Sequence, residues 1–136
     1  MALSEQAFER LMSETNVVVF GTLGPGGAPH QAPVWFEWRD GALLIPTERG
    51  SQKWRNIERD PRVSVCVERR EGPMAVALIS GTAEILDTDY TEYRARFYQR
   101  YYGEEAEARL AANSISPSQW ALVRVTPSKV ISFGTE

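Results

Sequence analysis

The sequence predicts a mainly β protein, an antiparallel β-barrel of six or so strands with covering helices. Three observations support this fold class: short apolar segments recur along the chain, turn residues separate them at short intervals, and few segments show helical spacing. A chain of 136 residues normally forms one domain, and no repeat or linker interrupts it, so residues 1–136 are expected to form a single domain.

Alternating or continuous apolar segments predict the strands. Residues 62–68 alternate most clearly, with valine at every second position. In residues 30–38 the even positions form a mostly apolar face and the odd positions a mixed one, so one face packs and the other is available. The expected strands cover residues 17–23, 30–38, 42–47, 62–68, 74–86 and 118–133. Gly81 predicts a bulge or a close backbone approach, and the last segment is expected as a strand pair or one bent strand, interrupted near Thr126-Pro127.

Helical spacing and capping residues predict the helices. Ser4 is the expected N-cap of a short first helix, and Pro61 ends a second helix over residues 52–59. Residues 87–89 resemble a cap for a third helix rich in aromatic residues, and a fourth helical piece follows over residues 104–113. The last two helices are expected to cover one opening of the barrel.

Charge and composition narrow the classes of function. The net charge is -3, with 15 Lys and Arg against 18 Asp and Glu, so no nucleic-acid partner is expected. No uninterrupted apolar stretch approaches the ~20 residues that cross a bilayer, so no membrane role is expected. The N-terminus lacks the basic start and apolar run of a signal peptide, which favours a cytoplasmic location.

Several enzyme classes lack their motifs in this chain. There is no GxGxxG after a strand, no GxxxxGK[ST], no GxSxG and no CxxC. With one His and one Cys no metal site is expected, and a Cys-His nucleophile pair would have to join Cys66 and His30. The simpler interpretation is that Cys66 is a small, half-buried strand residue and that His30 is a strand residue near a surface.

Residues 47–56 carry the strongest chemical signal. They bring a hydroxyl, backbone N–H groups and several cations to the start of a helix, where unsatisfied N–H donors and the helix dipole favour an anion. A phosphate could be held by Ser51, the backbone and Lys53 together. In the alternative, Ser51 only caps the helix while Lys53 and Arg55 form a solvated face.

Short motifs follow one another in a recognisable order along nearly the whole chain. They are Phe20-Gly21-Thr22-Leu23, Gly27-Ala28-Pro29-His30, Ala32-Pro33-Val34-Trp35-Phe36, Gly50-Ser51-Gln52-Lys53, Asn56-Ile57, Asp60-Pro61-Arg62-Val63 and Gly81-Thr82-Ala83. Together they resemble the pyridoxamine 5'-phosphate oxidase-like family of FMN-binding split barrels. The resemblance implies a split β-barrel that works as a homodimer, with cofactors at the subunit interface.

The resemblance also implies which residues bind the cofactor. A flavin or deazaflavin ring would lie against the strand that holds Gln31, Pro33 and Trp35, and Pro46 would border the ring. Residues of the partner subunit, from the aromatic helix or around Trp120, would complete the pocket; the alternative for Trp35 and Trp120 is dimer packing. The phosphate would be held by Thr47, Ser51 and Lys53, with Arg49 or Arg55 nearby. The implied cofactor-binding set is Gln31, Pro33, Trp35, Pro46, Thr47, Arg49, Ser51, Gln52, Lys53 and Arg55.

Two departures from the family pattern bear on the cofactor and substrate. Residues 31–37 contain neither Lys nor Arg, whereas oxidases of the family use basic residues there to reach the phosphate of FMN. One branch of the family resembles actinobacterial enzymes that use coenzyme F420. Its members have a Gly-Ser-x-Lys segment similar to the one in this chain and tolerate the absence of these basic residues, so F420 is favoured over FMN as the cofactor. The sequence ends at Gly134-Thr135-Glu136 without a basic motif for pyridoxal phosphate, so oxidation of vitamin B6 is not expected.

These observations predict an F420-dependent oxidoreductase that transfers a hydride between the cofactor and a small conjugated organic substrate. Tyr98, Tyr101, Glu37 or a water could donate the accompanying proton. The alternatives are an FMN-dependent oxidoreductase of the same fold, a non-catalytic protein that binds a flavin or haem-like ligand, and a β-barrel used only for interaction. Turnover distinguishes the enzymes from the carrier, and a bound chromophore distinguishes all of these from the interaction protein.

Overall fold

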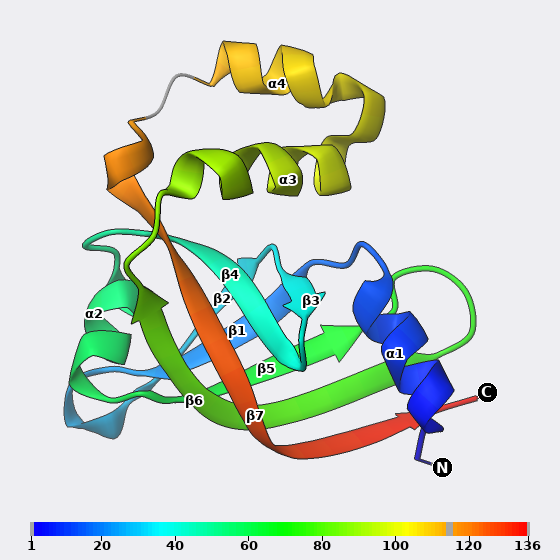
Figure 1. Cartoon of the computed structure of the whole chain (residues 1–136). Coiled ribbons are helices and arrows are strands. Elements are labelled where there is room, and N and C mark those ends of the chain that lie inside the picture. Colours follow the sequence, from blue (N-terminus) through cyan, green and yellow to red (C-terminus); the bar gives the residue numbers. More distant parts are fainter. Residues whose placement is uncertain (1, 114–115, 136) are drawn as a thin grey trace.

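One antiparallel sheet organises the chain in the computed structural model, which describes residues 2–113 and 116–135 (Figure 1). Its strands are β1 (Val18–Leu23), β2 (Pro29–Val34), β3 (Glu37–Arg39), β4 (Ala42–Glu48), β5 (Arg62–Glu68), β6 (Ala75–Leu86) and β7 (Trp120–Gly134). The order in the sheet is β2-β1-β5-β6-β7-β4-β3. Because β2 and β3 form the two edges, the barrel stays open between them. The predicted antiparallel split barrel is confirmed, with seven strands instead of six or so.

Helices lie outside the sheet and cover parts of it (Figure 1). They are α1 (Glu5–Ser13), α2 (Gln52–Arg59), α3 (Tyr90–Tyr102) and α4 (Ala106–Ala112). The Ser4 hydroxyl caps α1 as predicted, accepting from the Ala7 backbone N–H at 3.0 Å. Helix α2 matches its predicted bounds, and α3 and α4 form a hairpin beside one end of the barrel. Among the described residues, no helix has the length and apolar character needed to cross a membrane.

The segment over residues 30–38 is two strands and not one. β2 ends at Val34 and β3 begins at Glu37, and the chain between them passes from one edge of the sheet to the other. The Phe36 backbone N–H donates to the hydroxyl of Tyr101 at 3.0 Å, so α3 supplies the partner for this interruption. The predicted inward face is confirmed at Val34 and Phe36, which are both buried.

β7 is a single strand, which decides between the two predictions for the C-terminal segment. A Cβ atom on Gly81 would lie 2.3 Å from the carbonyl oxygen of Thr126, so the predicted close approach is confirmed. The register steps from Ser80 opposite Lys129 to Gly81 opposite Pro127, which is the predicted bulge. The bulge accommodates the proline without breaking the strand.

Two groups of buried side chains hold the fold. The main core fills the inside of the sheet and includes Phe20 and Ile45. A smaller core lies between α3 and the outer side of β4 and β7, and includes Leu44, Phe97 and Leu122. β4 is therefore buried on both faces, as a continuous apolar strand requires. The second core fixes where α3 lies.

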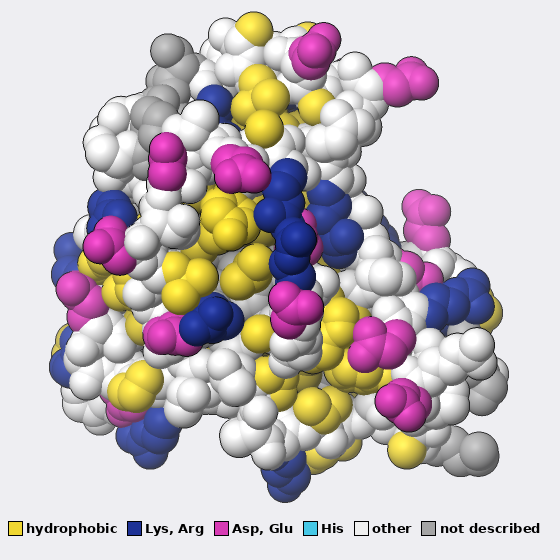
Figure 2. Space-filling view, in the orientation of Figure 1, with side chains coloured by type: hydrophobic (Ala, Val, Ile, Leu, Met, Phe, Trp, Pro, Cys, Tyr) yellow, Lys and Arg dark blue, Asp and Glu magenta, His cyan; other side chains and the backbone are white. Residues whose placement is uncertain are grey.

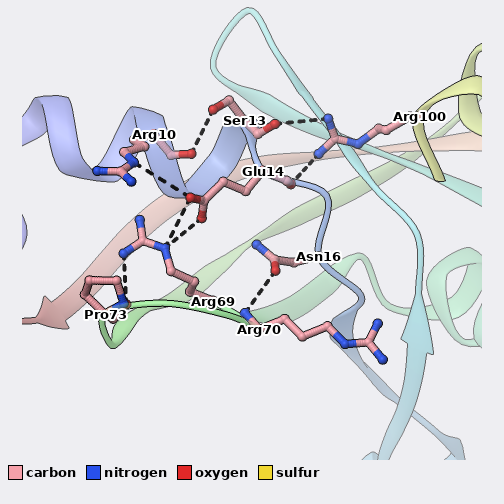
Figure 3. Close-up of polar contacts among 8 residues, drawn as sticks. All are labelled: Arg10, Ser13, Glu14, Asn16, Arg69, Arg70, Pro73 and Arg100. Carbon is pink, nitrogen blue, oxygen red and sulfur yellow. Dashed lines mark hydrogen bonds and ion pairs between the residues drawn. The ribbon is translucent and has the colours of Figure 1, made fainter. Parts of the chain in front are cut away.

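The segment after α1 joins three separate parts of the chain (Figure 3). The Glu14 carboxylate accepts from Arg69 Nε, with 2.9 Å between Nε and Oε1. The Arg69 side chain, only 3% exposed, also donates to the Pro73 carbonyl oxygen at 2.9 Å. Arg100 of α3 donates to the Glu14 carbonyl oxygen at 2.7 Å. This junction links α1, the β5–β6 loop and α3.

Replacing Glu14→Ala is expected to lower the free energy of unfolding by about 2 kcal/mol, because a hydrogen bond to a charged group contributes about 1.5–3 kcal/mol and Arg69 stays buried. Urea unfolding followed by tryptophan fluorescence measures this change. The exposed carboxylate variant Glu58→Ala is the control and should change stability by less than about 0.5 kcal/mol. Equal stability of Glu14→Ala and the unmodified protein would contradict the role of the junction.

Candidate functional site

The turn before α2 prepares the head of that helix. Gly50 has a φ of 78°, in the left-handed region that favours glycine, and lets the Ser51 N–H donate to the Glu48 carbonyl oxygen at 3.2 Å. The Ser51 hydroxyl caps α2 by accepting from the Trp54 N–H at 3.4 Å. Its own proton remains available to a ligand oxygen, so capping and anion binding are compatible.

Asn56 fixes α2 against the barrel. This fully buried residue donates from Nδ2 to the Thr22 hydroxyl of β1 at 2.9 Å and accepts at Oδ1 from Gln52 Nε2 at 2.7 Å. Arg55 in turn donates to Gln52 Oε1 at 3.0 Å. Gln52 and Arg55, both predicted to contact the cofactor, thus brace the head of the helix.

A cavity of about 270 Å³ lies beside Lys53. Its lining residues are Pro33, Val34, Trp35, Pro46, Lys53, Tyr90, Arg94, Tyr98 and Trp120. They come from β2, the link to β3, β4, α2, α3 and β7, so strands form one side and α3 another. On the face seen in Figure 2, hydrophobic side chains also gather beneath the helical hairpin, with Lys and Arg side chains beside them.

Aromatic packing holds Trp35 in place at the cavity wall. Its ring stacks on Tyr101, with centroids 4.6 Å apart and an interplanar angle of 6°, and meets the edge of Tyr98 at 5.7 Å. The Tyr101 hydroxyl donates to the Asn16 carbonyl oxygen at 2.7 Å, and burial raises the pKa of this phenol. Trp35 is therefore a rigid surface against which a planar ligand can pack.

Two cations line the cavity, and no Asp or Glu among the described residues does. Burial lowers the pKa of the half-buried Lys53, and the charge of Glu48 partly opposes this shift. Arg94 lies 5.0 Å over the ring of Tyr98, and its Nη2 donates to the Asn113 carbonyl oxygen. Neither cation makes a salt bridge within the described part of the chain. Such a cavity favours an anionic, planar ligand.

The structure brings four of the predicted cofactor-binding residues together in this cavity, places four more at the head of α2, and leaves Gln31 and Thr47 outside both groups. The four in the cavity are Pro33, Trp35, Pro46 and Lys53. At the head of α2 are Arg49, Ser51, Gln52 and Arg55. Gln31 lies in β2 and lines two other hollows, one together with Cys66 and Leu78 and the other together with His30. Thr47 is fully buried, does not line the cavity, and donates its hydroxyl to the Ile45 carbonyl oxygen at 3.2 Å.

Sequence reasoning missed the part that α3 of the same chain takes in the cavity. It expected the aromatic helix and the region around Trp120 to reach the pocket from a partner subunit, and Tyr90, Arg94, Tyr98 and Trp120 of this chain also line the cavity. Contacts from a partner subunit stay a prediction. The three α3 residues are spaced four apart and share one helix face. That spacing was the signal available in the sequence.

Cys66 and His30 lie on opposite faces of the sheet. Cys66 stands opposite Val19 of β1 and His30 opposite Thr22, and these β1 positions are three residues apart. A Cys-His nucleophile pair is therefore not formed. No group of three His, Cys, Asp or Glu side chains that could hold a metal ion occurs within residues 2–113 and 116–135.

The outer face of the sheet carries two aligned rows of side chains. One row is Val19, Cys66, Leu78 and Ile131, which stand opposite one another on four neighbouring strands. In this row Val19, Leu78 and Ile131 are 39%, 42% and 49% exposed. The next row on the same face is Gln31, Gly21, Ser64, Ser80 and Lys129. An exposed apolar row of this kind is typical of an interaction surface.

An open antiparallel barrel with a basic, aromatic cavity at a helix head defines a ligand-binding split-barrel protein. A family model described as pyridoxamine 5'-phosphate oxidase matches residues 4–133. The chain belongs to the pyridoxamine 5'-phosphate oxidase family, and its fold is one that binds flavin-type cofactors in oxidoreductases. No curated protein shows significant sequence similarity to the chain.

Solved structures confirm the fold. The conserved hypothetical protein Rv2991 from Mycobacterium tuberculosis is 25% identical with a TM-score of 0.78, over 98% of this chain and 86% of that one. An F420 reductase is 22% identical with a TM-score of 0.74, over 90% and 94% of the two chains. A FAD-binding protein from Mesorhizobium loti is 17% identical with a TM-score of 0.71, over 100% and 97%.

Replacing Asn56→Ala is expected to lower the free energy of unfolding by about 2 kcal/mol, because it leaves the buried Thr22 hydroxyl and the half-buried Gln52 amide without these hydrogen bonds. Urea unfolding again gives the value. The double variant Thr22→Val with Asn56→Ala should lose less than the sum of the two single variants, since the unsatisfied hydroxyl is gone. Additive losses would mean that the two side chains do not interact.

Proposed function

We propose that this protein is an F420-dependent oxidoreductase that transfers a hydride between the cofactor and a small conjugated organic substrate. One observation carries the proposal: Lys53 is a half-buried cation at the head of α2, beside an aromatic cavity, and no described carboxylate pairs with it. Removing Lys53 from water without a salt-bridge partner costs free energy, which the charge of Glu48 offsets only in part and which a bound phosphate would offset further.

The residues present fit such a cofactor. The Ser51 hydroxyl, the first N–H groups of α2 and Lys53 offer donors for a phosphate. Pro33, Trp35 and Pro46 offer a flat apolar wall for a tricyclic ring. When bound, the cofactor supplies the hydride chemistry, and the protein orients the reactants and excludes water.

Tyr98 is the proton donor in this proposal. The Tyr101 proton is engaged by the Asn16 carbonyl oxygen, and Glu37 pairs with Arg96 and Arg39. Tyr98 lines the cavity, and its hydroxyl oxygen accepts from Asn113 at 3.2 Å, which leaves its own proton free to donate. Tyr98 would give this proton to the substrate atom next to the one that receives the hydride, so that one double bond would be reduced, and water would return a proton to Tyr98.

The preference for F420 over FMN rests on where the cations lie. The strand and link that line the cavity contribute Pro33, Val34 and Trp35, none of them charged, so α2 supplies the cations for the phosphate. A solved relative of the same fold carries the name F420 reductase. FMN-dependent chemistry on the same fold is the second candidate, since another relative binds FAD.

The cofactor assignment is tested by titrating purified protein with F420 and with FMN, following cofactor fluorescence at one salt concentration. Tight binding of F420 and weak binding of FMN supports the proposal, and the reverse order favours the FMN enzyme. Mixing the reduced complex with a panel of conjugated acceptors then separates an enzyme from a carrier, because only an enzyme reoxidises its cofactor with turnover. Failure to bind either cofactor would contradict both.

Lys53→Ala is expected to weaken cofactor binding about tenfold or more, because a charge-assisted hydrogen bond contributes about 1.5–3 kcal/mol. Lys53→Arg keeps the charge and should retain part of the affinity. The same fluorescence titration measures both variants, with the exposed Arg39→Ala as control. Unchanged affinity in Lys53→Ala would remove the proposed phosphate anchor.

A homodimer that places the cofactor at the subunit interface completes this proposal. The outer apolar row supports it, because Leu78 and Ile131 stand side by side in register at the centre of the exposed face. Leu78→Glu is expected to raise the dissociation constant of the dimer by tenfold or more, about 1.4 kcal/mol, in sedimentation experiments. Ala111→Glu, exposed on α4, should leave it unchanged. A monomer before any substitution would rule the dimer out.

A further inference from the structure

We infer that Arg94 makes the cavity selective for conjugated substrates that carry a carboxylate. The inference extends the proposed function. That the ligand is a substrate rests on the proposed function, whereas the preference for a carboxylate rests only on the residues that line the cavity. It starts from a surplus of charge: the phosphate anchor uses Lys53, and Arg94 is a second cation in the same lining.

Arg94 is held in the cavity wall by contacts that leave its charge unneutralised. Its Nη2 donates to a carbonyl oxygen, that of Asn113, and its guanidinium lies over the ring of Tyr98. Arg94 Nε is buried and has no hydrogen-bond partner among the described residues. The protein therefore leaves the hydrogen-bonding capacity of this guanidinium incompletely satisfied. A carboxylate is the strongest acceptor for the guanidinium of a residue that lines a cavity.

The two cations reach the cavity from different elements. Lys53 lies on α2 at the side of the barrel, and Arg94 lies on α3 beside its end (Figure 1). Arg94 therefore does not belong to the set of donors at the head of α2. It shares α3 with Tyr98, one turn further along the same helix face. A carboxylate held by Arg94 would bring the conjugated part of the same molecule to the proposed proton donor.

The rest of the lining defines the other features of the ligand. Tyr90, Tyr98 and Trp120 present aromatic rings in addition to the wall of Pro33, Trp35 and Pro46 that is proposed for the cofactor ring, so a small planar molecule can pack against them. A neutral molecule of the same shape would pack against these rings equally well. It would leave Arg94 without a counter-charge, so an acid should bind about tenfold more tightly than its amide.

The test is isothermal titration calorimetry with trans-cinnamate and its neutral isostere trans-cinnamamide. Both are titrated into protein without added cofactor and into protein saturated with F420 or FMN. The unmodified protein should bind the acid about tenfold more tightly than the amide. Arg94→Gln should remove that preference, while Arg94→Lys, which keeps the charge, should retain most of it. Arg109→Gln is the matched control, because Arg109 stacks on Tyr102 outside the cavity lining.

The inference would be overturned if the acid and the amide bound with equal affinity, or if cinnamate bound neither to the cofactor-free nor to the cofactor-saturated protein. A preference for the acid that survives in Arg94→Gln would overturn it as well. Thermal unfolding of each variant verifies that Arg94→Gln is folded, and Arg94→Lys decides the matter if it is not. Cofactor titrations on the same variants separate the two proposals. A preference for the acid without any cofactor binding would contradict the proposed function and leave the selectivity of Arg94 standing.

Discussion

The hydroxyl of Tyr101 is the contact on which the rest of this structure depends. It donates to the Asn16 carbonyl oxygen and accepts from the Phe36 N–H, two backbone groups far apart in the sequence. These bonds fasten α3 beside the open side of the barrel, where the chain passes between the two sheet edges. The ring of the same tyrosine stacks on Trp35. One residue thus satisfies the backbone at the split and positions a wall of the cavity.

The cavity contains two cations that have no salt-bridge partner in the described part of the free protein. Lys53 and Arg94 are drawn partly out of water without carboxylate partners among the described residues, which is unfavourable in the free protein. The packing of α3 on β4 and the network around Asn56 hold the surrounding elements in place. The anionic planar ligand proposed above would offset this cost.

The strands contribute side chains both to the core and to the outer face of the sheet, because successive side chains point to opposite faces. Phe20 and Val65 point into the core, while their neighbours Val19 and Cys66 form part of the exposed row. The main core is built from residues of one chain, and the outer row lies outside it. It is available for contact with another molecule, and the polar row beside it supplies hydrogen-bonding groups at the same face.

The sequence by itself determined the local features: the bounds of α2 and β5, the bulge at Gly81, and the motifs that placed the chain in its family. These follow from capping, alternation and backbone conformation within a few residues. Only the tertiary structure decided that residues 30–38 divide between two sheet edges, and that α3 of the same chain brings Arg94 to Lys53. The reason is physical, since both depend on packing between segments about forty or more residues apart, which no local pattern encodes.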